Sequence, residues 1–154
     1  EAKIADDDGG AWHRMGDVGY LDDVGRFWYC GRKSQRLETS DGPMYTECVE
    51  ALFNAHRDIQ RTALVGIGPR GRQTPVVVCE PTPVVARRGG RRMSKDAVLQ
   101  LVCELRELAT KHRPSRGIEH FLIRDDLPVD VRHNAKINRE QLAVWAAKQL
   151  PELA

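Results

Sequence analysis

No run in the 154-residue sequence approaches the roughly 20 consecutive apolar residues that a membrane-spanning helix needs. An excess of one charge is also lacking, because 24 basic residues face 22 acidic ones, for a net charge of +2. That balance does not favour a polyanionic partner attracted by the overall field. The chain begins without methionine or an apolar leader, so we expect a cytoplasmic piece of a longer protein.

The sequence also lacks the signatures of many enzyme and metal sites. Cys30, Cys48, Cys79 and Cys103 show no two-residue gap typical of a metal or redox motif, and we expect reduced, buried thiols. There is no Gly-x-x-x-x-Gly-Lys-Ser/Thr phosphate loop, nucleophile elbow or His-Glu-x-x-His zinc motif. The five histidines show no metal-ligand spacing, so no metal site is expected.

What is present is typical of one globular domain, with 41% apolar and 30% charged residues. In the first half of the chain, local patterns predict a hairpin over 16–31, a helix capped by Thr46 and buried strands over 62–67 and 75–80. A loop over 81–92 is followed by a helix over 95–111, capped by Ser94, and by a strand over 120–123. A loop over 127–135 leads to a last helix capped by Asn138, with Gln141 completing a capping box. These elements predict an α+β fold, with helices packed on a small mixed sheet and a β-hairpin at the N-terminal end.

Residues 12–22 read Trp-His-Arg-Met-Gly-Asp-Val-Gly-Tyr-Leu-Asp. This resembles the aromatic-Arg-Thr-Gly-Asp-x-Gly segment that closes the large domain of adenylate-forming enzymes, which include acyl-CoA synthetases, peptide-synthetase adenylation domains and luciferases. The resemblance implies that Asp17 accepts hydrogen bonds from both ribose hydroxyls of ATP, a role that suits the two oxygens of a carboxylate. Met15 replaces the family's Thr. Without the resemblance, Asp17 reads as an ordinary turn residue.

Residues 31–37, Gly-Arg-Lys-Ser-Gln-Arg-Leu, resemble the hinge stretch of the same family. The resemblance implies that Arg32 approaches the ribose or phosphates of the nucleotide and that the hinge falls near Ser34. It divides the chain into residues 1–31, the end of a large domain with its hairpin, and residues 32–154, a C-terminal lid. The large N-terminal ATP-binding domain is expected to lie outside this chain and to be the lid's main partner.

Residues 127–139, Leu-Pro-Val-Asp-Val-Arg-His-Asn-Ala-Lys-Ile-Asn-Arg, resemble the family's Leu-Pro-…-Gly-Lys-Ile-x-Arg. The resemblance implies that Lys136 enters the active site during adenylation. Ala135 replaces the usual Gly, and the preceding loop is slightly longer than in the family. An ammonium about 4 Å from an anion contributes on the order of 4 kcal/mol at an effective dielectric near 20. Outside this context, Lys136 reads as a solvated loop residue.

The sequence from about Trp12 to Leu150 most resembles one subgroup, the β-lactone synthetases of bacterial long-chain olefin biosynthesis. This implies ATP and Mg²⁺, both held mainly by the large domain, and a β-hydroxy acid that closes to a β-lactone without CoA. The alternative is the lid of a fatty acyl-CoA ligase. Cys48 disfavours it, because it replaces the first Glu of a family triplet near the thiol-acceptor loops. Other olefin-pathway enzymes are possible partners of this subgroup.

Two further interpretations remain open. The arginine-rich run over 87–92 could bind nucleic-acid phosphates, but no aromatic residues interleave with it, so we expect a solvated loop and no nucleic-acid partner. The chain could instead be a non-catalytic module that docks a pathway partner. His133, close to Lys136, is the histidine that merits substitution.

Overall fold

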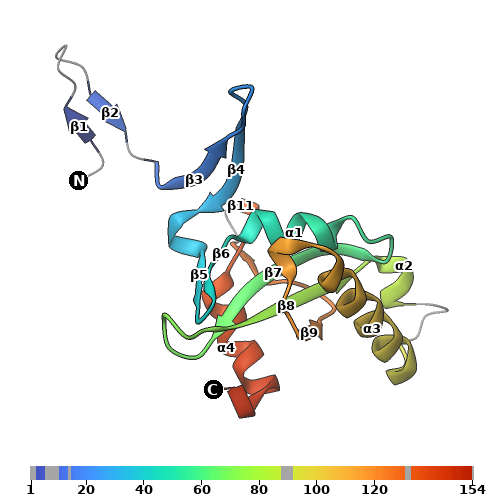
Figure 1. Ribbon diagram of the computed structural model, residues 1–154. Helices are drawn as coiled ribbons and strands as arrows, with labels where there is room; N and C mark the ends of the chain where they lie inside the picture. The colour runs from blue at the N-terminus through green and yellow to red at the C-terminus, as the bar shows by residue number, and fades with distance from the viewer. Residues whose placement is uncertain (1–2, 6–10, 14, 88–91, 131–132, 154) are drawn as a thin grey trace.

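The structure, a computed structural model, describes residues 3–5, 11–13, 15–87, 92–130 and 133–153. Its body is a three-stranded sheet with helices on both faces, and two hairpins extend from this body at the N-terminal end (Figure 1). This confirms the predicted α+β architecture. Within the described ranges, no helix is both long and apolar enough to cross a membrane.

The elements follow in a regular order along the chain. The strands are β1 (Lys3–Ala5), β2 (Ala11–His13), β3 (Asp17–Leu21), β4 (Phe27–Arg32), β5 (Leu37–Thr39), β6 (Gly42–Met44), β7 (Ile59–Ile67), β8 (Thr74–Pro81), β9 (His120–Ile123), β10 (Val129–Asp130) and β11 (His133–Ile137). The helices are α1 (Thr46–Asn54), α2 (Pro83–Ala86), α3 (Lys95–Lys111) and α4 (Arg139–Gln149), with 3-10 turns at Lys33–Gln35, Arg113–Ser115 and Pro151–Leu153.

The central sheet has the order β7-β8-β9, with β8 antiparallel to β7 and parallel to β9. Successive side chains of a strand point to opposite faces, so Leu64 and Val77 pack on one face while Val65 and Val76 pack on the other. The first face is covered by α1 and α3, and the second by α4 (Figure 1). Coverage of both faces explains the near-continuous apolar runs of β7 and β8, as predicted.

Large side chains from helices α1, α3 and α4 anchor these layers. Phe53 of α1 is fully buried and meets Phe121 of β9 edge-to-face, with ring centroids 5.2 Å apart. Leu105 of α3 and Leu142 of α4 are also fully buried, on opposite sides of the sheet. Burial of one such side chain stabilises the fold by about 1.5–3 kcal/mol, so these contacts fix the helices against the sheet.

Both long helices begin at their predicted caps. Ser94 Oγ accepts a hydrogen bond from the Ala97 amide at 3.2 Å, and Asn138 Oδ1 accepts one from the Gln141 amide at 3.0 Å. The Asn138 amide, which the reciprocal half of a capping box would use, donates instead to the carbonyl of Pro128 at 2.8 Å. This bond ties the start of α4 to the segment before β10.

The predicted cap at Thr46 was wrong. Thr46 is the first residue of α1, and Tyr45 precedes it in an extended conformation. The Thr46 side chain is buried against Gly31 of β4, and its Oγ1 has no hydrogen-bond partner among the residues the structure describes. Tertiary packing therefore overrides the capping preference of Thr at this position.

Two predicted loops contain regular structure. The loop expected over 81–92 holds helix α2, which starts at Pro83 because a proline ring favours the first turn of a helix. The loop expected over 127–135 contains β10 and the beginning of β11, which pair antiparallel. Neither strand shows a clear apolar alternation, so the pairing left no local signal in the sequence.

The expectation of four buried cysteines was half right. Cys30 and Cys79 are buried, Cys48 is half-buried and Cys103 is exposed; all four are free. Cys103 lies two residues after the buried Leu101 of α3, which turns its side chain about 200° away from the core face.

The β3–β4 pair confirms the hairpin predicted over 16–31, and its turn has Gly25 at φ +80°. The side chains of this hairpin are unusually exposed for their type. Tyr20 and Trp28 stack across the two strands with ring centroids 6.4 Å apart, yet both are about half exposed. Other large apolar residues exposed on and beside this hairpin are Met15, Leu21, Val24, Phe27 and Tyr29. An apolar surface of this kind is typical of a face that another protein segment covers.

Candidate functional site

Asp17 and Arg32 lie directly opposite each other at the base of the β3–β4 hairpin. Arg32 Nε is 3.0 Å from Asp17 Oδ1, and Arg32 Nη1 donates to the carbonyl of Met15 at 2.8 Å. The Arg32 side chain is 48% exposed and the Asp17 side chain is 31% exposed. The two residues predicted to contact nucleotide are therefore adjacent, and both can be reached from solvent.

Ser34 follows Arg32 by two residues, in the 3-10 turn between β4 and β5. The residues that flank the turn, Arg32 and Arg36, have extended backbones with ψ of 135° and 143°. Ser34 itself is exposed. A short exposed turn between two extended segments can redirect the chain through a few φ/ψ changes, so its geometry suits the predicted hinge.

Lys136 is exposed on β11, one residue before the strand ends. Together with Ser34, Arg36 and Arg139, it lines an open hollow of about 800 Å³ beside β7 and the start of α4. The Asp17–Arg32 pair does not line this hollow. The predicted site residues thus form two groups, the carboxylate–guanidinium pair and the lysine hollow, joined through the turn at Ser34.

Two of the cations around the hollow already have carboxylate partners. Arg36 Nε contacts Glu38 Oε1 at 2.7 Å, and Arg139 is paired with the buried Glu50. Lys136, in contrast, is exposed, whereas Arg36 and Arg139 are partly buried. Of these three cations, Lys136 is therefore the one whose position suits the approach of an external anion.

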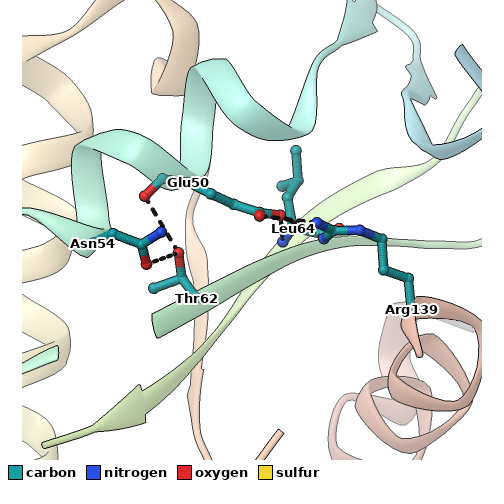
Figure 2. Close-up of polar contacts among 5 residues, drawn as sticks. All are labelled: Glu50, Asn54, Thr62, Leu64 and Arg139. Atoms are coloured by element: carbon teal, nitrogen blue, oxygen red, sulfur yellow. Dashed lines mark hydrogen bonds and ion pairs between the residues drawn. The ribbon is translucent and has the colours of Figure 1, made fainter. Parts of the chain in front are cut away.

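Sequence reasoning missed the Glu50–Arg139 pair. Figure 2 shows the guanidinium of Arg139 reaching from α4 across β7 to the Glu50 carboxylate of α1. Figure 2 also shows a second contact between α1 and β7, in which Thr62 Oγ1 donates to Asn54 Oδ1 at 3.0 Å. The two partners of the ion pair are 89 residues apart, so no local spacing could have revealed it.

His56, Asp58 and Glu104 also meet without a signal in the sequence, with one possible ligand atom from each within 4.8 Å of the others. His56 Nδ1 accepts the Asp58 amide at 3.3 Å, and His56 Nε2 faces Glu104 Oε2 at 3.3 Å. The Nδ1 lone pair is engaged by the Asp58 amide, so in this arrangement it is not free to bind a metal ion. We interpret the cluster as a hydrogen-bonded joint between the end of α1 and α3.

Some sequence-based expectations fall outside the described parts. His133 belongs to β11, but its side chain is not among those described. Residues 88–91 of the arginine-rich run lie outside the described residues as well. At the end of that run, Arg92 Nη2 pairs with Asp125 Oδ2 at 3.0 Å, on an exposed surface.

Comparison with known proteins adds an independent line of evidence. No protein-family model matches the chain. Two curated relatives are both named olefin beta-lactone synthetase. That of Xanthomonas campestris pv. campestris is 50% identical over 137 residues, which cover 89% of this chain and 23% of the relative. That of Stenotrophomonas maltophilia is 50% identical over 142 residues, which cover 92% of this chain and 24% of the relative. A 4-chlorobenzoate–CoA ligase from Arthrobacter sp. is 30% identical over 152 residues, 96% of this chain and 26% of the relative.

Solved structures show the same fold at low identity. The amide bond synthetase McbA from Marinactinospora thermotolerans superposes with a TM-score of 0.67 at 20% identity, covering 89% of this chain and 25% of that one. The o-succinylbenzoate CoA synthetase of Bacillus subtilis, in complex with ATP and magnesium ion, gives 0.64 at 22% identity, with 90% and 25% covered. This chain is homologous to the C-terminal domain of adenylate-forming enzymes.

The chain spans about a quarter of the length of the curated adenylate-forming relatives that it matches. Its identity is 50% to the β-lactone synthetases and 30% to the CoA ligase from Arthrobacter. Within the adenylate-forming enzymes, the sequence is therefore more similar to the first group than to the second.

Proposed function

We propose that this chain is the lid of an ATP-dependent enzyme that joins a carboxylic acid to AMP. The observation that carries this proposal is the exposed Lys136, which shares a hollow with the turn at Ser34. Rotation at Ser34 would change the position of this lysine relative to Asp17, which lies before the turn. In this proposal, residues 1–31 move with a large ATP-binding domain and residues 32–154 form the lid.

The apolar surface of the β3–β4 hairpin supports a covering partner on that side of the hinge. Phe27 and Leu21, for example, are 61% and 68% exposed, although solvent-exposed aromatic and aliphatic side chains on two adjacent strands are unfavourable. The curated relatives are about four times longer than this chain. We propose that their additional length includes the large domain against which this hairpin packs.

The residues present fit a nucleotide substrate. The Asp17 carboxylate can accept hydrogen bonds from a vicinal diol, and the Arg32 guanidinium can donate to phosphate or ribose oxygens. Within the described ranges, no group of side chains with metal-ligand geometry lines the lysine hollow. We therefore propose that Mg²⁺, which neutralises phosphate charge in such reactions, is held mainly by the large domain.

In the first half-reaction, a carboxylate oxygen bonds to the α-phosphorus of ATP. The bond from that phosphorus to the bridging oxygen breaks, and pyrophosphate leaves. Two anions must meet for this to happen, and the Lys136 ammonium offsets their repulsion. At about 4 Å the contribution is on the order of 4 kcal/mol, which corresponds to roughly a thousandfold in rate when it acts only in the transition state.

In the second half-reaction, we propose that the substrate's own β-hydroxyl oxygen attacks the activated acyl carbon. The bond between that carbon and the AMP oxygen breaks, the hydroxyl proton is lost to solvent, and a four-membered lactone and AMP are released. The similarity to two olefin β-lactone synthetases favours this outcome. The alternative, in which CoA is the acceptor, rests on the similarity to a CoA ligase, whose sequence identity to this chain is lower.

The test uses the complete enzyme with MgATP and a 3-hydroxy fatty acid, with and without CoA. We expect pyrophosphate, AMP and a β-lactone in equal amounts without CoA. The matched acid without the hydroxyl group should support ATP–pyrophosphate exchange but not AMP release. AMP release that requires CoA would establish the ligase alternative, and absence of exchange with every acid would overturn the proposed function.

A further inference from the structure

One buried carboxylate connects three elements of the lid. Glu50 of α1 accepts hydrogen bonds from Arg139 Nη1 and, at 2.9 Å, from Arg139 Nη2, and its Oε1 also accepts the amide of Leu64 in β7 at 2.6 Å. Arg139 Nη1 additionally donates to the Leu64 carbonyl at 3.3 Å. Figure 2 shows this arrangement, in which the arginine of α4 crosses the sheet strand to reach α1.

This ion pair is well shielded from water, with the side chains of Glu50 and Arg139 only 7% and 16% exposed. Burial raises the pKa of Glu50, and hydrogen bonds from Arg139 oppose that rise. Well-packed apolar residues often stabilise a fold as much as a buried ion pair does, so stability alone is a weak reason for its presence. A bidentate pair with directional bonds fixes the relative position of its two elements more tightly.

The pair lies at the base of the segment that carries the predicted catalytic lysine. Arg139 follows Lys136 by three residues, and the Asn138 amide between them donates to Pro128 at 2.8 Å. The segment is also held where it begins, because Glu80 of β8 accepts the Leu127 amide at 2.9 Å. Both ends of the β10–β11 hairpin are thus tied to the sheet through a carboxylate.

From this arrangement we propose that the Glu50–Arg139 ion pair is a positioning device, which fixes the base of the β10–β11 hairpin and thereby aims the Lys136 ammonium. The inference rests on the proposed function, in which Lys136 meets the charge that develops at the α-phosphate. Arg139 lines the same hollow as Lys136, but its guanidinium is occupied by Glu50 and acts through the lysine rather than on the substrate. Displacement of a reacting group by about 1 Å can cost on the order of a hundredfold in rate.

The test compares Arg139→Met with wild type in the complete enzyme, using ATP–pyrophosphate exchange. We expect kcat to fall about 10- to 100-fold while KM for ATP changes less than about 2-fold, because the aim of Lys136 is disturbed but nucleotide contacts are not. Arg139→Lys, which keeps the charge but loses the bidentate geometry, should recover part of the rate. Arg106→Met, which removes an exposed hydrogen bond from Arg106 of α3 to the Glu119 carbonyl, is the matched control.

The decisive measurement places Arg139→Met in a Lys136→Ala background. If Arg139 acts through Lys136, the second substitution causes no further loss of kcat, because the group that it positions is already gone. A full additional loss in that background would overturn the positioning role alone and leave the proposed function intact. If Lys136→Ala itself leaves kcat unchanged, the proposed function and this inference both fail.

A second readout uses this chain and does not depend on activity. Hydrogen exchange of the β11 amides should become faster in Arg139→Lys, while the amides of β8 keep their wild-type protection. This measurement also serves if Arg139→Met does not fold. Unchanged exchange in β11 would overturn the proposal.

Discussion

Gly31 stands at the junction of the hairpin and the lid, and alanine at this position should be strongly destabilising. Its φ of +122° is a conformation that residues with a side chain rarely adopt. A Cβ built there would lie 2.6 Å from Thr46 Oγ1 and 3.5 Å from Glu47 Cγ. Backbone strain of about 1–3 kcal/mol and overpacking of about 1–3 kcal/mol together predict a loss of roughly 2–6 kcal/mol.

The assay is urea denaturation of this chain, which gives the free energy of unfolding of each variant. Gly25→Ala is the matched control, because Gly25 also has a positive φ (+80°) but open space around a built Cβ, so that only about 1–2 kcal/mol should be lost. Thr46→Ala removes the clashing oxygen, which is buried and has no partner within the described part of the chain.

Gly31→Ala combined with Thr46→Ala should therefore regain the steric part of the loss but not the strain. The expected coupling between the two substitutions is about 1–3 kcal/mol. If Gly31→Ala costs no more than Gly25→Ala, or if the two changes are additive, the close packing of β4 against α1 is not what fixes this junction.

Three further predictions concern the hairpin, the thiols and the core. Hydrogen bonds, of which the one from Trp28 Nε1 has the largest effect, hold the pKa of Asp22 at about 2, below its usual 3.8. The ionised carboxylate therefore stabilises the folded hairpin fully above about pH 4, and this stabilisation is lost as the pH falls through 2. Tryptophan fluorescence should report this transition in wild type and not in Asp22→Asn. A thiol reagent should label the exposed Cys103 rapidly in the folded chain and Cys79, whose pKa burial raises, only on unfolding; equal rates would contradict the structure. Phe53→Ala should cost about 3–5 kcal/mol in urea denaturation, and a loss below 1 kcal/mol would show that this core face is loosely packed.

Elements with a strong local pattern could be predicted from the sequence. Helix α3 was predicted with the bounds that the structure has, because Ser94 caps it and its apolar residues recur at helical spacing. Strands β7 and β8 were predicted from their apolar runs, since both faces of the sheet are covered. The hairpin over 16–31 was also predicted, and Gly25 in its turn adopts the positive φ that such a turn favours.

Polar contacts between distant segments could not be predicted. The Glu50–Arg139 pair joins two helices across a strand. The His56–Glu104 contact joins the segment after α1 to α3, and its two residues are 48 positions apart. Neither contact has a periodic signal in the sequence. At Thr46 the local pattern predicted a helix cap, but the side chain is buried by tertiary packing instead. The candidate site itself was located by resemblance to a family, and the roles of Asp17 and Lys136 stay predictions.

The most direct test of the central claim is the rate of ATP–pyrophosphate exchange by the complete enzyme with Lys136→Ala. Lys148→Ala, which removes another exposed lysine from the last turn of α4, is the control for a general loss of surface charge. We predict a roughly thousandfold lower rate for Lys136→Ala and an unchanged rate for Lys148→Ala, with both proteins folded. Exchange by Lys136→Ala at the wild-type rate would contradict the account.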